Sequence, residues 1–143
     1  MKRFRFRLQR ILDIREQFRD EARQELGRRN AELSHQESVL RGLEDELTRL
    51  QPGKDGTLTA GELLLTGAYA LRVQQLIVQQ LVRVEEARRA MVVAQEKYIQ
   101  ANKDAKALEM LRDRKRAEYD QEMLKEEINQ LDEVAVQRAG AKD

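Results

Sequence analysis

Residues 40–62 read LRGLEDELTRLQPGKDGTLTAGE, and this stretch holds the end of one helical pattern, a break and the start of a second. The segment PGKDG at 52–56 is a strong breaker, because proline removes a backbone donor and glycine enters turns at little cost. Thr59 and Glu62 then fit a capping box, in which each side chain accepts from the other residue's backbone N–H. The stretch therefore predicts a turn over residues 52–59 and a new helix from about residue 60.

The segment before the break carries leucines at the spacing of a coiled-coil seam. They recur at steps of seven, three and four residues: Leu26, Leu33, Leu40, Leu43, Leu47 and Leu50. Such steps place apolar side chains on one stripe of a helix that faces another helix. The stripe continues less strictly upstream through Leu8, Ile11, Leu12, Phe18 and Ala22, and the polar Arg29 and Gln36 interrupt it. We expect helix one at about residues 8–51.

The segment after the break has a longer apolar pattern. Its main positions are Val73, Ile77, Leu81, Val84, Met91, Tyr98, Ala105 and Leu108, and the pattern continues to about residue 136. We therefore expect helix two at about 60–136 and, over residues 1–143, a single all-α domain folded as an antiparallel coiled-coil hairpin. Roughly 30 residues of helix two would extend past the start of helix one, and we expect a partner to cover this overhang, because isolated helices are marginal in water.

The composition fits a hairpin better than a globule. Charged residues make up 37% of the chain and aromatic residues 4%, and tryptophan is absent. A seam between two helices needs fewer large apolar side chains than a spherical core. The absence of cysteine excludes disulfides and thiolate metal sites. With no membrane-length apolar run and no signal-peptide pattern, we expect a cytoplasmic protein.

Residues typical of catalysis or cofactor binding are missing. No glycine-rich phosphate-binding loop occurs, and the single histidine, His35, lies among polar residues. The acidic pairs Glu85-Glu86 and Glu126-Glu127 fit solvated helix faces, because adjacent residues do not face each other on a helix. Acids such as Asp13 interrupt the basic start, so a DNA-binding basic region is not expected. We expect no enzyme, no cofactor, no metal and no nucleic acid.

The first ten residues are basic and contain no acid. Their cations are Lys2, Arg3, Arg5, Arg7 and Arg10. One interpretation is a solvated helix start. The other is a basic tip that docks into an acidic or carbonyl-lined socket of another protein.

The string FRFRLQRILDIRE at residues 4–16 resembles the start of the flagellar export proteins of the FliJ family. That family's pattern of alternating phenylalanines, an aliphatic pair, an acid, an aliphatic and a base is filled by Phe4, Phe6, Leu8, Ile11, Leu12, Asp13, Ile14 and Arg15. The length, the single break and the longer second helix also match. Tyr69 and Leu76 fit the family's pattern at the start of helix two, whereas Arg72 stands where an aromatic residue is expected.

The resemblance implies a fold like the two-helix stalk of the rotary ATPase gamma subunit and a role in flagellar export. The implied partners are the hexamer of the export ATPase FliI, the cytoplasmic domain of the export-gate protein FlhA, and export chaperones. The implied location is the cytoplasmic face of the inner membrane, reached peripherally through the gate. The ATPase-binding tip would comprise Arg3, Phe4, Arg5, Phe6, Arg7, Leu8 and Ile11. The gate-binding surface would comprise Leu43, Leu47, Tyr69, Arg72 and Leu76.

Three other functions remain open on the sequence. A stalk protein of a virulence type III secretion system would have the same fold and different cargo. An ATP-independent coiled-coil chaperone would grip clients with its helix tips. A structural coiled-coil dimer would pair the seam between chains, which the break at Pro52 disfavours.

Overall fold

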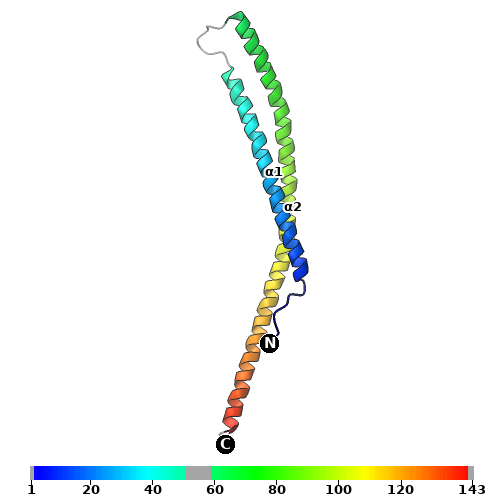
Figure 1. Cartoon of the computed structure of the whole chain (residues 1–143), viewed down its shortest axis with the longest axis vertical. Helices are drawn as coiled ribbons and strands as arrows, with labels where there is room; N and C mark the ends of the chain where they lie inside the picture. The colour runs from blue at the N-terminus through cyan, green and yellow to red at the C-terminus, as the bar shows by residue number, and fades with distance from the viewer. Residues whose placement is uncertain (1, 51–58, 142–143) are drawn as a thin grey trace. The chain divides into compact units, whose positions relative to one another are not determined.

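Two long helices make up almost all of the described chain. The computed structural model describes residues 2–50 and 59–141, so the predicted break at 52–56 lies outside the described residues. Helix α1 spans Gln9–Arg49 and helix α2 spans Ala60–Ala141 (Figure 1). They pack against each other as an antiparallel helical hairpin, and no strand occurs in the part that is described. The predicted all-α hairpin is confirmed.

A capping box opens α2. The backbone N–H of Thr59 donates to Glu62 Oε2 at 3.1 Å, and the N–H of Glu62 donates to Thr59 Oγ1 at 3.2 Å. These two bonds satisfy backbone donors that have no partner inside the first turn. The capping box predicted from the sequence is therefore present, and it fixes where the helix begins.

Residues Asp20–Ile99 form one compact unit, in which α1 and α2 share a narrow seam. The α1 side is lined by half-buried leucines at the predicted spacing, namely Leu26, Leu33, Leu40, Leu43, Leu47 and Leu50. On the α2 side the most buried residues are Val73, Gln80 and Ala94. Because only two helices are in contact, most seam side chains stay half-buried. The stability of this unit therefore depends mainly on its few buried residues.

The seam of this unit contains a glutamine pair instead of a leucine. Leu81, expected at the seam, is 50% exposed, whereas Gln80 is 4% exposed. The heptad that starts at Val73 reaches Gln80 and Ala94 after seven and twenty-one residues, so Leu81 falls beside it. The Gln80 amide nitrogen donates to Gln36 at its Oε1 and its backbone carbonyl. The expectation that Leu81 lies in the seam is wrong. Gln36, which interrupts the leucine stripe of α1, is paired with Gln80 of α2.

The described residues of Met1–Arg19 and Gln100–Asp143 form the second unit. Leu12 and Ala105 are fully buried in it. Ile11 and Phe18 were expected to continue the seam, but they are 46% and 50% exposed, because the turn that buries Leu12 points them outward. Two ion pairs lie near the buried residues, Arg19 to Glu109 at 2.8 Å and Arg15 to Asp104 at 3.5 Å.

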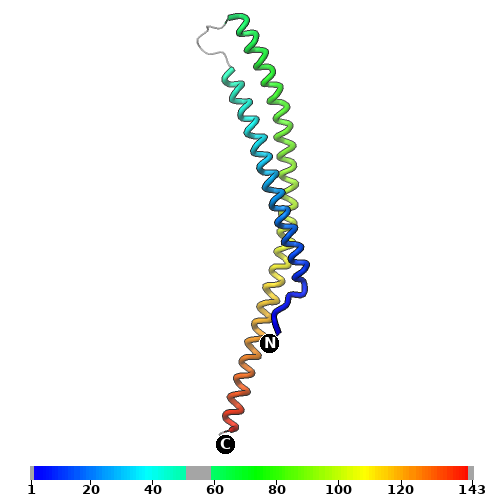
Figure 2. Tube along the Cα trace, in the orientation of Figure 1, coloured from blue at the N-terminus to red at the C-terminus, as the bar shows by residue number. Residues whose placement is uncertain are grey.

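The last turns of α2 carry exposed apolar residues. They are Leu124, Ile128, Leu131, Val134 and Val136. Residues 2–8 run beside an earlier part of α2 in the same unit (Figure 2), where they line a groove with Leu111 and Met123. Part of the expected overhang is thus covered by the chain's own N-terminal residues. In the described ranges, neither helix is apolar enough over a sufficient length to cross a membrane.

Candidate functional site

Residues 2–6 have no regular secondary structure, and Arg7 and Leu8 form a turn that leads into α1. We call residues 2–7 the basic segment. Phe4 and Phe6 are half-buried while Arg3, Arg5 and Arg7 are exposed. This alternation with a period of two is typical of extended backbone, in which successive side chains point to opposite sides. The sequence FRFRL carries this alternation, whereas a solvated helix start was one of the two interpretations of these residues.

Turn geometry ends the basic segment and begins α1. The backbone N–H of Gln9 donates to the carbonyl of Phe6 at 3.1 Å. The N–H of Leu12 then donates to the carbonyl of Leu8 at 2.9 Å, which is the helical pattern. Leu12, in the first turn of α1, is fully buried. Packing therefore fixes the N-terminal end of α1, where the basic segment joins it.

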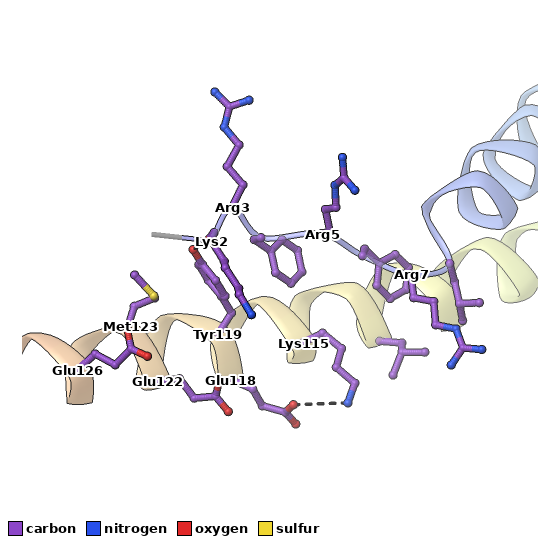
Figure 3. A pocket seen from close by; sticks show the side chains of 14 residues that line it. Lys2, Arg3, Arg5, Arg7, Lys115, Glu118, Tyr119, Glu122, Met123 and Glu126 are labelled. Carbon is purple, nitrogen blue, oxygen red and sulfur yellow. Dashed lines mark hydrogen bonds and ion pairs between the residues drawn. The ribbon is translucent and has the colours of Figure 1, made fainter.

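The basic segment is held on α2 by aromatic contacts. The ring centroids of Phe4 and Tyr119 are 5.6 Å apart with an interplanar angle of 51°. The guanidinium of Arg116 lies 5.2 Å from the centroid of the Phe4 ring. The Tyr119 hydroxyl donates to the backbone carbonyl of Lys2, and Tyr119 rises from α2 toward the segment (Figure 3). We call Phe4, Arg116 and Tyr119 the aromatic anchor.

A groove of about 870 Å³ lies between the basic segment and α2. Its apolar lining includes Phe4, Phe6, Leu8, Leu111 and Met123. Its α2 wall also carries the acids Glu118, Glu122 and Glu126. Glu118 pairs with Lys115 of the same helix at 3.5 Å. The apolar side chains of the segment therefore face α2, where acids and apolar groups are mixed.

The cations of the basic segment are available to a partner. Arg3 and Arg5 project away from α2 (Figure 3). In the described ranges, 2–50 and 59–141, none of Lys2, Arg3, Arg5 and Arg7 has an ion-pair partner. Guanidinium groups bind carboxylates in a bidentate manner and carbonyls by several donors. The arrangement can dock an acidic protein surface.

An apolar stripe on α1 lies in the same unit as the basic segment. Ile11, Ile14 and Phe18 are 46%, 45% and 50% exposed. Their spacing of three and four residues places them on one face of a helix. Of these three residues, only Ile11 belongs to the expected ATPase-binding tip. The spacing is the signal that could have identified Ile14 and Phe18, but it fitted the internal seam equally well.

The second expected surface lies in the unit Asp20–Ile99. Leu43, Leu47 and Leu76 are half-buried at the helix pair, while Arg72 is exposed and Tyr69 is 47% exposed. The Tyr69 hydroxyl donates to Glu46 Oε1 at 2.8 Å, which ties α2 to α1. This hydrogen bond to a carboxylate raises the pKa of Tyr69 above its ordinary value.

The same part of α2 exposes three leucines that lie outside the expected gate-binding surface. Leu64, Leu65 and Leu71 are 76%, 74% and 62% exposed. The sequence around these leucines is also poor in charge, since Arg72 is the only charged residue between positions 63 and 82. In a chain with 37% charged residues, an exposed helical stretch this poor in charge is typical of a surface that contacts another protein.

A groove of about 400 Å³ lies between the helices in this unit. It is lined by Leu47, Leu50, Leu63, Thr66, Gly67, Ala70 and Gln74. Of the five expected gate-binding residues, only Leu47 lines it. The structure therefore distributes the expected surface over the helix pair, and the exposed leucines extend it along α2.

The described residues offer no constellation for metal chemistry. In residues 2–50 and 59–141, no three His, Cys, Asp or Glu side chains come close enough together to hold a metal ion. His35 is exposed on α1. What these two units present to other molecules is a set of charged and apolar surfaces.

Comparison with known proteins identifies the family. The family model described as "Flagellar FliJ protein" matches residues 4–143, nearly the whole chain. No curated protein and no solved structure matches this chain. The matched range includes the FRFRL string, both helices and the seam. The family is one of flagellar protein export components, so the chain belongs to the FliJ family of flagellar export proteins.

Proposed function

We propose that this protein is a non-enzymatic stalk and coupling component of the flagellar type III export apparatus. It binds the hexameric ring of the export ATPase FliI and promotes its assembly and ATP hydrolysis. It links this ring to the cytoplasmic domain of FlhA and to export chaperones. It works in the cytoplasm, at the cytoplasmic face of the inner membrane, and it is associated with that membrane only peripherally, through the gate.

The observation that carries the ATPase role is the basic segment. Arg3, Arg5 and Arg7 are exposed, and they have no ion-pair partner in the described chain. Unpaired exposed guanidinium groups attract an acidic surface over about 8 Å at physiological salt. Phe4, Phe6 and Leu8 also belong to the expected tip, but in this proposal they face α2 rather than the ATPase. Their side chains line the groove beside α2. Ile11, with Ile14 and Phe18, adds apolar contact area.

The gate role is supported by the charge-poor stretch of α2. Exposed leucines there would lose contact with water on binding. This burial contributes about 25 cal/mol per Å² of apolar area, which is offset in part by the entropy lost on association. Leu43, Leu47, Tyr69, Arg72 and Leu76 form the expected surface, and Leu64 and Leu71 extend it. The double variant Leu64→Ser and Leu71→Ser should lose FlhA binding and keep ATPase activation.

The ATPase role is tested by charge reversal. The variant Arg3→Glu, Arg5→Glu and Arg7→Glu should abolish activation of FliI and ring formation, while helicity measured by circular dichroism stays nearly unchanged. Helicity should stay because these residues precede α1, which begins at Gln9. ATP hydrolysis is measured against the concentration of added variant, and ring formation is followed by sedimentation.

A matched variant controls for net charge. Arg41, Arg49 and Arg83 are exposed cations without an ion-pair partner in the described chain. Reversing all three to Glu changes the formal net charge from +1 to −5, a loss of two charges at each site, as the first variant does. The control should still activate the ATPase. Equal activation by both variants, or equal loss in both, would exclude the basic segment as the docking site.

A further inference from the structure

The basic segment raises a problem that its charges alone do not solve. Extended backbone with no helical or sheet hydrogen bonds moves freely unless other contacts hold it. The cations do not supply these contacts, since no ion pair joins them to Glu122 or Glu126 within the described residues. Something else must fix the direction in which the arginines point.

The aromatic anchor supplies that restraint. Tyr119 and Arg116 lie three positions apart on α2, so both side chains share one face of the helix. Tyr119 approaches the Phe4 ring at a centroid distance of 5.6 Å, and Arg116 lies at 5.2 Å from the same ring. The hydrogen bond from Tyr119 to the Lys2 carbonyl adds a backbone restraint. The Phe4 ring and the Lys2 carbonyl are thereby both held against Tyr119 of α2.

The period of two then determines where the arginines point. In extended backbone, holding Phe4 against α2 turns Arg3 and Arg5 to the opposite side. Figure 3 shows both arginines on that side. Arg116 also pairs with Asp120 at 3.5 Å, which limits its side-chain freedom and steadies it beside the ring. The anchor thus orients cations that it does not itself touch.

We propose that Tyr119 and Arg116 are positioning residues for the basic segment. They act through Phe4 and present Arg3 and Arg5 to the ATPase in one orientation. This inference rests on the proposed ATPase role of the segment. A presented row of cations binds at lower protein concentration than a mobile one, because less conformational freedom is lost on docking.

The anchor itself is tested without any partner. The chain has no tryptophan, so Phe4→Trp introduces a single fluorescent reporter into the full chain. In that background, Tyr119→Ala should shift the emission to longer wavelength and lower its anisotropy, because the indole loses its packed neighbour. Arg116→Ala should have a smaller effect in the same direction. Tyr119→Phe should keep most of the signal, since the ring remains.

Tyr98 provides a matched control on the same helix. Its ring has the Arg23 guanidinium at 5.8 Å, so it makes a similar cation–π contact in the unit Asp20–Ile99. Tyr98→Ala should leave the reporter at position 4 unchanged. Helicity of every variant is checked by circular dichroism, so that a general loss of structure is recognised.

The positioning role is tested with natural Phe4 by titrating each variant into the export ATPase. Tyr119→Ala should raise the half-saturating concentration about 3- to 10-fold, the range expected from losing an aromatic pair and weakening a cation–π contact. The activation reached at saturation should stay the same, because the arginines are intact. Tyr119→Phe should restore most of the affinity.

Each outcome has a distinct meaning. A reporter signal unaffected by Tyr119→Ala overturns the anchor. A lost anchor signal with an unchanged half-saturating concentration overturns the positioning role and leaves the ATPase role intact, provided that reversal of Arg3, Arg5 and Arg7 still abolishes activation. If that reversal has no effect, the proposed function fails and the positioning role fails with it. A raised half-saturating concentration, with rescue by Tyr119→Phe, supports the inference.

Discussion

The side-chain amide of Gln80 donates to two oxygens of Gln36, the side-chain Oε1 at 2.6 Å and the backbone carbonyl at 2.9 Å. Gln80 is 4% exposed, so this polar pair lies inside the seam between α1 and α2. A single polar pair at a coiled-coil seam favours one register, because other registers would leave the buried amide without partners. The pair fixes which residues of the two helices face each other in this unit.

Removing the Gln80 amide should destabilise the protein measurably. Gln80→Ala leaves Gln36 without its donor and opens space in the seam, so we expect a loss of about 1–2 kcal/mol in the free energy of unfolding. Urea unfolding followed by circular dichroism measures this loss. Gln79→Ala, at an exposed neighbouring position, should change the unfolding free energy by less than about 0.5 kcal/mol. Equal effects of the two substitutions would argue against the polar pair as a determinant of register.

Two leucines of the same chemistry should differ widely in their importance. Leu12 is 0% exposed and Leu131 is 69% exposed. Leu12→Ala should cost about 2–4 kcal/mol, because burial of the side chain is lost and a cavity remains. Leu131→Ala should cost about 0.5 kcal/mol or less. Thermal and urea unfolding of the two variants checks this, and a large effect at Leu131 would mean that the end of α2 is packed in solution.

The capping box should contribute to the start of α2. Thr59→Ala removes the hydroxyl that accepts from the Glu62 N–H, and it should lower the free energy of unfolding by about 1 kcal/mol. Thr48→Ala is the matched control. The Thr48 hydroxyl donates to the Glu44 carbonyl within α1, and alanine has the higher helix propensity there, so stability should stay equal or rise. A destabilisation of the same size at both positions would contradict a capping role.

Tyr69 should titrate above the ordinary tyrosine value of 10.0. Its protonated hydroxyl donates to Glu46, and the carboxylate disfavours the nearby tyrosinate. The raised pKa means that the folded state holds its proton longer than the unfolded state. The stabilising contribution of this contact is therefore complete below pH 10.0 and is lost as the pH rises through the raised pKa.

Tyrosinate absorbance in a Tyr98→Phe and Tyr119→Phe background reports Tyr69 alone, because the chain has three tyrosines. Glu46→Gln should lower the Tyr69 pKa toward the ordinary value. An unchanged titration in that variant would show that Glu46 does not cause the shift.

Much of the fold could be predicted because it depends on local patterns. Steps of three and four residues between leucines define a seam on a helix whatever the partner is. Thr59 with Glu62 caps α2 through bonds across three residues. The basic character of the N-terminal residues could also be predicted, since the residue types that carry charge do not depend on folding.

The sequence left two choices between neighbouring residues unresolved. Nothing in the spacing decides that Leu12 is buried while Ile11 is exposed, or that Gln80 lies in the seam while Leu81 lies outside it. Adjacent residues lie about 100° apart around a helix, so a rotation of the helix by about that angle exchanges their environments. Only packing against a second helix settles the rotation.

The residues of the basic segment were named from the sequence, whereas their conformation was not predicted. The cations of the basic segment were recognised from the sequence, but the ring that Phe4 contacts belongs to Tyr119, more than a hundred residues further along the chain. The local sequence determined two helices, the cap of the second helix and a basic start, because each depends on residues within a few positions. Only the tertiary structure decided which ring meets Phe4 and which glutamines pair, because contacts between distant segments depend on the register of the two helices.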